Sequence, residues 1–301
     1  SQTVYDSVRQ LMDVDSFADY LILNFWGANL DWPHNNWYAV RHRPTNGPFT
    51  FIAWDVENFI FATNATGPLS TTTNNSPGVI WSRLRRNKEF MTYFADRVQK
   101  HCFNQGALTS SANIARFSQI SSHLRPAMNI EAARWGDTRE EPPINAIDQL
   151  DPLIDQKVTR YFPARTTIFL NQLRSNHIFP ETDAPIFSQH GGQIILGTTV
   201  NIGNPNASGT IYLTTDGSDP RLQGGAINPL ASSSNSATIG GPTSLLARIR
   251  STSGEWSALA SADFVTASDP LPGNLVISEI HYHPADVSPD EILAGHTDQD
   301  D

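Results

Sequence analysis

The stretch NFWGANLDWPHNNWYAVR, residues 24–41, decides how this chain of 301 residues is interpreted. Residues 16–26, which overlap the start of this stretch, carry apolar side chains at the spacing of a largely buried helix. Ser16 with Asp19 three residues later resembles an N-terminal capping box, and Gly27 suits the residue that follows a helix. We therefore predict a buried helix that ends at Gly27 and leads into a polar loop.

A β-hairpin is predicted directly after this loop. Two extended runs, residues 36–43 and 49–55, flank the segment PTNGP, whose residues favour a turn. If the hairpin closes symmetrically about Asn46, position 37 lies opposite position 55. Because directly paired Cβ atoms are roughly 4.5–5.5 Å apart, Asp55 would come within reach of Asn36.

Three oxygen-bearing side chains thus converge at one end of the predicted hairpin. Asp31 lies five residues before Asn36, and Asp55 ends the second extended run. Two carboxylates and a carboxamide suit Mg²⁺ with bound phosphates. In protein kinases a catalytic Asp is followed five residues later by a metal-binding Asn, and a second Asp beyond a hairpin holds the metal. The same residues also suit ordinary turns and strand ends, so the spacing alone leaves both interpretations open.

The remaining sequence divides into two regions. Residues 77–177 are mainly helical in pattern, as Phe90, Phe94 and Val98 illustrate at intervals of four. Residues 185–265 are rich in Gly, Ser, Thr and Asn and break into short extended runs, which is typical of a small antiparallel β-sandwich. The predicted fold class is a multidomain α+β protein, mainly α with a hairpin first and all-β afterwards.

Composition excludes several partner classes. The net charge is −10, and seven acids with no Lys or Arg in residues 271–301 leave −3 for the rest. Nucleic acids and anionic membranes are held by clustered Lys and Arg, so we expect neither as a partner. The single cysteine, Cys102, excludes an intrachain disulfide. No apolar run approaches the ~20 residues that span a bilayer, so no membrane span is predicted.

Four further segments share one family resemblance with the opening stretch. They are FIAWDVENFIF (51–61), SPGVIWSRLRRNKEFMTYFADRVQKHCFNQGALT (76–109), RWGD (134–137) and LNQLRSNHIFP (170–180). Together these segments resemble the CotH (spore coat protein H) kinase family over nearly all of residues 15–180. The resemblance implies an atypical protein-kinase-like fold that transfers phosphate from ATP to protein substrates.

The resemblance also implies roles for the three candidate residues. Asp31 would be the catalytic base, Asn36 a metal ligand and Asp55 the principal metal ligand. Asn29-Leu30 precedes Asp31 where ordinary kinases have His-Arg, and Val56-Glu57 follows Asp55 in place of Phe-Gly. Both departures suit an atypical family.

The sequence before Asp31 has no room for the N-lobe of a kinase. That lobe supplies a Gly-rich loop and a strand Lys that grips the phosphates. The three lysines, Lys88, Lys100 and Lys157, all lie downstream of Asp31 on predicted helices. We therefore expect the N-lobe upstream in a longer parent polypeptide, and this chain alone to bind nucleotide poorly and to be inactive.

Two shorter resemblances concern the C-terminal half. GTIYLTTDGSDPR (209–221) and LLARIRSTSGEWSALASADF (245–264) resemble the chitobiase/β-hexosaminidase C-terminal module, an Ig-like sandwich. NLVISEIHYHP (274–284) resembles the start of a bacterial lamin-tail domain. The implied domains are a kinase-like C-lobe at 1–180, a sandwich at 185–266 and a truncated lamin-tail-like segment at 274–301. Such modules imply a bacterial protein that works in the cell envelope or outside the cell.

Two functional hypotheses follow from different classes. The leading one is a fragment of a CotH-type kinase that uses ATP with Mg²⁺ or Mn²⁺ to phosphorylate Ser or Thr of an extracellular or envelope protein. The alternative is a non-catalytic adhesion or carbohydrate-binding protein on a degenerate kinase scaffold, with cell-surface polysaccharide bound through the sandwich.

Other residue groups allow a functional and a structural interpretation each. His34 and His42 can suggest zinc but lack a third ligand at a usual spacing, so the loop interpretation is favoured. Asp216 and Asp219 suit either Ca²⁺ or turns. The pair His101-Cys102 fits the end of a helix better than a nucleophilic pair. The aromatic group can pack in a core or stack a sugar or an adenine, and it comprises Trp26, Trp32, Trp37 and Trp54.

Overall fold

The computed structural model describes residues 2–56, 59–60, 75–138, 143–266 and 293. The chain divides into two units, Ser1–Thr266 and Ala267–Asp301. The predicted lamin-tail-like segment, 274–301, lies outside the described residues except for Leu293. The fold below is therefore that of the first unit.

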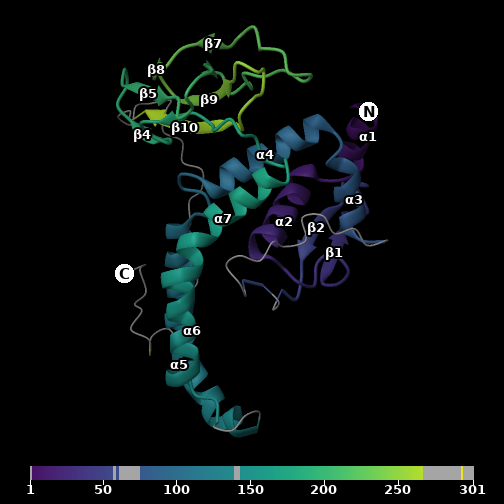
Figure 1. Cartoon of the computed structure of the whole chain (residues 1–301), viewed down its shortest axis with the longest axis vertical. Helices are drawn as coiled ribbons and strands as arrows, with labels where there is room; N and C mark the ends of the chain where they lie inside the picture. The colour runs from purple at the N-terminus through teal and green to yellow at the C-terminus, as the bar shows by residue number, and fades with distance from the viewer. Residues whose placement is uncertain (1, 57–58, 61–74, 139–142, 267–292, 294–301) are drawn as a thin grey trace. The chain divides into compact units, whose positions relative to one another are not determined.

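The described part of this unit is mixed, with helices first and strands later, as the sequence predicted (Figure 1). Its helices are α1 (Gln2–Leu11), α2 (Val14–Gly27), α3 (Pro77–Leu84), α4 (Lys88–Cys102), α5 (Ser110–Trp135), α6 (Asp151–Gln156) and α7 (Phe162–Ser175). A 3₁₀ turn, η1 (Gly136–Thr138), and two π-helical turns, η2 (Ala146–Leu150) and η3 (Lys157–Tyr161), also occur. The strands β1 (Trp37–Val40) and β2 (Thr50–Ala53) form the predicted hairpin.

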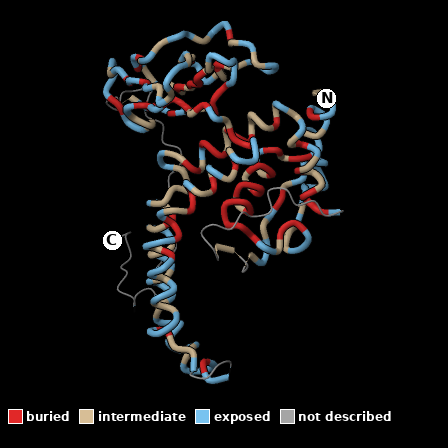
Figure 2. Tube along the Cα trace, viewed as in Figure 1, coloured by how far each residue is buried: buried red, intermediate tan, exposed pale blue. Residues whose placement is uncertain are grey.

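Helix α2 is the centre of the helical core. Its apolar residues Phe17, Leu21 and Phe25 are fully buried and join Phe90 and Phe94 of α4 in one cluster. Burying each such side chain contributes roughly 1.5–3 kcal/mol. Figure 2 shows the buried residues gathered along α2, whereas α5 and α6 are mainly intermediate or exposed. The loop that follows α2 is thus held by the most buried element of this region.

The start of α2 differs from the prediction. Asp13 is the N-cap residue, and its carboxylate accepts a hydrogen bond of 3.0 Å from the Ser16 amide. Ser16 therefore lies inside the helix, and the predicted capping box with Asp19 is wrong. Asp19 instead accepts hydrogen bonds from Arg97 and His101 of α4. The Asp19 carboxylate, which the local spacing assigned to a helix cap, is therefore paired with residues distant in the sequence.

Helix α2 ends at Gly27, as predicted, but Gly27 is not the residue that follows the helix. Gly27 is the last helical residue, and Ala28 takes the left-handed conformation with a φ of 52°. A Cβ at position 27 would lie 1.6 Å from the ring of Phe59, so any larger residue would have to displace that ring. The glycine that suggested a helix end thus makes room for the segment beyond the hairpin.

The hairpin register is two residues away from the predicted one. Trp37 pairs with Ala53, not with Asp55, so the turn is centred on Thr45. The cause is Phe49, whose amide donates to the carbonyl of Leu11 at 2.8 Å and whose carbonyl accepts from Asp13 at 2.9 Å. Phe49 therefore leaves the hairpin to pair with the turn between α1 and α2.

The C-terminal strands form two sheets, ordered β4-β10-β9-β6-β7 and β3-β5-β8. They are β3 (Ile186–Phe187), β4 (Gly192–Ile194), β5 (Thr199–Gly203), β6 (Thr210–Thr214), β7 (Ser232–Ser233), β8 (Ser236–Thr238), β9 (Thr243–Arg250) and β10 (Ala260–Thr266). Alternating residues of these strands bury one apolar core. The pairs are antiparallel as predicted except β4 with β10, which is parallel.

Candidate functional site

The loop after α2 presents Asp31 half-buried at its tip. Its amide donates a hydrogen bond of 3.1 Å to the Asn29 carboxamide, and its carbonyl accepts one of 3.1 Å from the Asn35 amide. The Trp32 side chain that follows is 2% exposed and packs edge-on against Phe25. Asp31 is therefore a polar residue held between two anchored neighbours.

The side chain of Asn36 contacts both Asp31 and Asp55, the two candidate carboxylate residues. Its side-chain nitrogen lies 3.4 Å from a carboxylate oxygen of Asp31 and donates at 2.8 Å to the main-chain carbonyl of Asp55. The amide of Trp54 donates back to the Asn36 carbonyl at 3.3 Å. The structure thus places all three candidate residues at one end of the hairpin, despite the shifted register.

Backbone conformation marks the same two positions. Asn36 has a φ of 58° and Asp55 a φ of 51°, in the left-handed region that residues other than glycine rarely adopt. Such conformations cost of order 1–3 kcal/mol and gather at functional sites, where the surroundings enforce them. Both residues adopt this conformation next to the half-buried Asp31.

The donor set fits a hard divalent cation. Two carboxylates and a carboxamide offer only oxygen ligands from the protein, and Mg²⁺ takes its remaining ligands from water and phosphates. Within the described ranges, no group of three or more His, Cys, Asp or Glu residues is placed to hold a metal. A metal here would be held by Asn36 and Asp55 together with oxygens of a bound phosphate. His34 and His42 are both exposed, and His42 contacts Thr45 at 2.9 Å.

Two buried basic residues anchor the backbone around this site, and the sequence analysis assigned neither to it. The Lys157 amine donates at 2.7 Å to the carbonyl of Ile60, just beyond Asp55, and burial lowers the pKa of Lys157. Arg165 donates to the carbonyls of Trp26, at 2.5 Å, and Phe25, at 3.0 Å, at the end of α2. In the sequence, the only signal for this role of Lys157 and Arg165 was that each is a charged residue in an otherwise helical pattern.

Residues 1–159 match the family model described as CotH kinase protein. The chain belongs to the CotH kinase family. A search of the curated proteins gave no match, and neither did a search of the solved structures. The matched region of the CotH chain contains α2, the hairpin and all three candidate residues. The helices of the described part include none long and apolar enough to cross a membrane.

Aromatic residues of the CotH loop and hairpin separate into two groups. Trp26 and Trp32 are 2% exposed and belong to the core. Trp54, Tyr38 and Ile52 lie exposed on the outer face of the hairpin, where Tyr38 and Ile52 are paired in register. The rings of Tyr38 and Trp54 meet edge to face at 5.6 Å. The core interpretation thus holds for the first group, while the second offers a surface for stacking.

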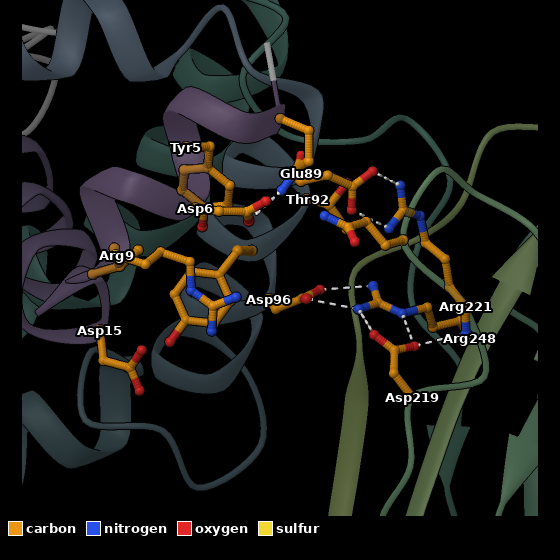
Figure 3. A pocket seen from close by; sticks show the side chains of 14 residues that line it. Tyr5, Asp6, Arg9, Asp15, Glu89, Thr92, Asp96, Asp219, Arg221 and Arg248 are labelled. Carbon is orange, nitrogen blue, oxygen red and sulfur yellow. Dashed lines mark hydrogen bonds and ion pairs between the residues drawn. The ribbon is translucent and has the colours of Figure 1, made fainter.

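A second polar cluster lies between α4 and the sandwich, beside a cavity of about 300 Å³ (Figure 3). Arg248 of β9 reaches Asp96 of α4 through contacts of 2.7 and 2.6 Å, and Asp219 through two contacts of 2.7 Å. Arg221 forms a bidentate pair with Glu89 at 2.7 and 2.8 Å. Figure 3 shows both arginines reaching from the sandwich toward acids of α4.

The remaining candidates of the sequence analysis have structural roles. Asp216 accepts from the amide and hydroxyl of Ser218 in a turn, and Asp219 is paired with Arg248. Cys102 is buried, which raises the pKa of its thiol, and the neighbouring His101 hydrogen bonds to Asp19 at 2.8 Å. These contacts favour the turn and helix-end interpretations.

Proposed function

We propose that this chain contains the C-terminal lobe of an atypical CotH-type protein kinase. Its parent would transfer the γ-phosphoryl group of ATP, with Mg²⁺ or Mn²⁺, to Ser or Thr hydroxyls of a protein in the bacterial cell envelope or outside the cell. The observation that carries the proposal is the side chain of Asn36, which contacts both Asp31 and Asp55 in a chain of the CotH kinase family.

The roles follow from the position of each group. The Asp31 carboxylate would accept the proton of the acceptor hydroxyl as its oxygen bonds to the γ-phosphorus, while the bond from that phosphorus to the β–γ bridging oxygen breaks and ADP leaves. Asn36 and Asp55 would hold the metal, which neutralises charge on the phosphates when bound. General-base catalysis of this kind contributes typically about 10²–10⁴-fold, and positioning supplies much of the rest.

The parent would also need an N-lobe, which we propose lies upstream of this chain. The stretch before Asp31 contains no lysine and no Gly-rich loop. The exposed face formed by Tyr38, Ile52 and Trp54 supports a base-stacking surface between the lobes, since purines stack on aromatic and apolar groups. We expect Tyr38→Ala to weaken nucleotide binding several-fold with little effect on folding.

The same exposed aromatic pair supports the second candidate, a carbohydrate-binding protein on a kinase scaffold. Sugars also stack on aromatic faces. Binding to insoluble polysaccharide that Asp31→Ala and Asp55→Ala leave unchanged, and that Trp54→Ala abolishes, would favour this candidate.

The deciding experiment is phosphate transfer from labelled ATP by a chain extended upstream to include the N-lobe. We expect transfer with Mg²⁺ or Mn²⁺, and a loss of about 10²-fold or more in both Asp31→Ala and Asp55→Ala. Asp155→Ala, which removes an exposed carboxylate of α6, is the matched control. No transfer and no metal-dependent nucleotide binding by the folded extended chain would refute the kinase proposal.

The 301-residue chain allows an independent test of the metal ligands. Mn²⁺ bound near Asp55 would broaden the NMR signals of the loop after α2 and of the hairpin, and Asp55→Asn would reduce the effect. Equal broadening in the chain and in the Asp55→Asn variant would show that the metal binds elsewhere.

A further inference from the structure

We propose that Asn24 and Asn29 are positioning residues that hold Asp31 for catalysis, an inference that rests on the proposed kinase function. They form a chain of hydrogen bonds that runs from the interior of α2 to the main chain of Asp31. Neither residue contacts the predicted metal ligands Asn36 and Asp55 in any of the hydrogen bonds described below.

The chain consists of three consecutive side-chain contacts. Asn24 donates to the carbonyl of Tyr20 at 2.8 Å, one turn earlier in α2. Asn29 donates to the carboxamide oxygen of Asn24 at 2.8 Å, and its own oxygen accepts from the Asp31 amide at 3.1 Å. The Asn29 amide also donates to the Asn24 carbonyl at 3.0 Å. Each carboxamide therefore uses both its donor and its acceptor.

Burial makes the arrangement selective. Asn24 and Asn29 are each 1% exposed, and a buried polar group left without a partner costs about 1–3 kcal/mol. Flipping the Asn29 carboxamide would set its oxygen against the Asn24 oxygen, two acceptors, and its amino group against the Asp31 amide, two donors. The Asn29 oxygen is thus kept facing the Asp31 amide, and Asp31 is kept at one place in the loop.

The other side of Asp31 is tied to the same residue of α2. The Trp32 indole donates to the Tyr20 hydroxyl at 2.7 Å, while the Tyr20 carbonyl is the end point of the Asn24 contact. Asp31 and Trp32 are therefore both tied to one turn of a largely buried helix. A displacement of about 1 Å at a reacting group can cost roughly 100-fold in rate.

The position of Asn29 supports a role beyond packing. Ordinary kinases have His-Arg immediately before the catalytic Asp, whereas this chain has Asn29-Leu30, and Leu30 is 62% exposed. The polar anchor of the catalytic loop is therefore carried by the carboxamide of Asn29 together with Asn24.

The test is steady-state phosphate transfer by the extended chain carrying Asn29→Ala. We expect kcat to fall by about 10- to 100-fold with KM for ATP within about twofold of the parent, because only Asp31 is misplaced. In the Asp31→Ala background, Asn29→Ala should cause no further loss, since its effect acts through Asp31. A kcat within twofold of the parent, or an equal loss in both backgrounds, would overturn the proposal.

A matched control lies in α5. The buried Asn113 side chain donates to the carbonyl of Thr109 at 2.8 Å, the same contact one turn back that Asn24 makes with Tyr20. Asn113→Ala should lower stability comparably while leaving kcat unchanged. A similar loss of kcat in Asn113→Ala would show that general destabilisation explains the result.

Two further measurements cover the case in which Asn29→Ala does not fold. Asn24→Asp retains an oxygen that accepts from Asn29, whereas Asn24→Leu does not, so Asn24→Asp should keep a several-fold higher kcat. Equal values of kcat in the two variants would contradict the proposal.

In the 301-residue chain, hydrogen exchange of the Asp31 amide should be about tenfold faster in Asn24→Leu than in the parent, and an unchanged rate would overturn the inference. If the extended chain transfers no phosphate or Asp31→Ala is fully active, the proposed function fails instead, and the exchange measurement still decides whether the contacts exist.

Discussion

Replacing Arg248 by methionine tests whether the sandwich is a fixed part of the helical lobe. The guanidinium makes five hydrogen bonds, to the carboxylates of Asp96 and Asp219 and to the carbonyl of Ser257. Its side chain is 1% exposed, against 15% for Asp96 and 37% for Asp219. Arg248→Met retains an apolar stem in place of the arginine side chain but leaves the Asp96 carboxylate buried without its cation.

The expected cost follows from this burial. Removing one partner of a buried ion pair costs about 3–5 kcal/mol, because the other charge stays uncompensated. Asp219 adds less, since it is more than a third exposed and water screens its charge. For a unit of this size each kcal/mol lowers Tm by roughly 2–4 °C, so we expect a decrease on the order of 10 °C.

The assay is thermal unfolding of the 301-residue chain, followed by tryptophan fluorescence and by circular dichroism. Arg125→Met is the matched control, because Arg125 forms the same bidentate pair with Asp151, at 2.6 and 2.8 Å, on an exposed surface. We expect no resolvable change in that variant. A decrease of less than about 2 °C in Arg248→Met, or equal decreases in the two variants, would refute the argument from burial.

A second variant separates the ion pair from its packing. Replacing Arg248 and Asp96 together by apolar residues removes both charges, and such replacements of buried pairs are often neutral or stabilising. We therefore expect Arg248→Met combined with Asp96→Leu to recover much of the Tm lost in Arg248→Met alone. Simple additivity of the two single variants would mean that the charges do not interact.

Two other predictions concern the helical core. Gly27→Ala should destabilise the chain by about 1–3 kcal/mol in chemical denaturation, because its Cβ meets the Phe59 ring; an unchanged cost in a Phe59→Ala background would contradict this cause. Burial raises the pKa of the Asp19 carboxyl, but hydrogen bonds from His101 and Arg97 outweigh burial and lower the pKa to about 2 from a usual value of 3.8. The stabilisation that the Asp19 carboxylate contributes is therefore present above pH 4 and lost as the pH falls toward 2. Because the Asp19 side chain is 35% exposed, water screens part of this effect. The difference in unfolding free energy between the parent and Asp19→Asn should be about 1 kcal/mol near pH 6 and vanish near pH 2. A difference that does not change with pH would refute this prediction.

Local patterns predicted the elements that position the site. The buried helix, the hairpin and the helical run after Pro77 all occur, and residues 210–214 form one of the short strands predicted within 185–265. These features depend on apolar periodicity and turn residues over short windows, which the chain itself displays. The proximity of Asn36 to Asp55 also followed from the hairpin, because an error of two residues still leaves its ends together.

Long-range pairing decided what the sequence analysis missed. The register depends on Phe49, which pairs with Leu11 and Asp13, and nothing within the hairpin sequence indicates that contact. Arg248 and Asp96 are 152 residues apart, so no local pattern connects them. Asn24 has the spacing of a core position in a helix, but its role depends on Asn29 lying opposite in the folded loop.

These contacts bear on where the helical lobe ends. The family match stops at residue 159, yet Arg165 of α7 donates to two carbonyls at the end of α2, and the indole of Trp26 donates to Thr166 at 3.1 Å. The loop that carries Asp31 therefore depends on a helix beyond the matched region. The same reasoning extends to the sandwich, because Asp96 would be left without its cation if β9 were removed. A ligand of the sandwich must then use surfaces other than the one that carries Arg248 and Arg221, since α4 already occupies it.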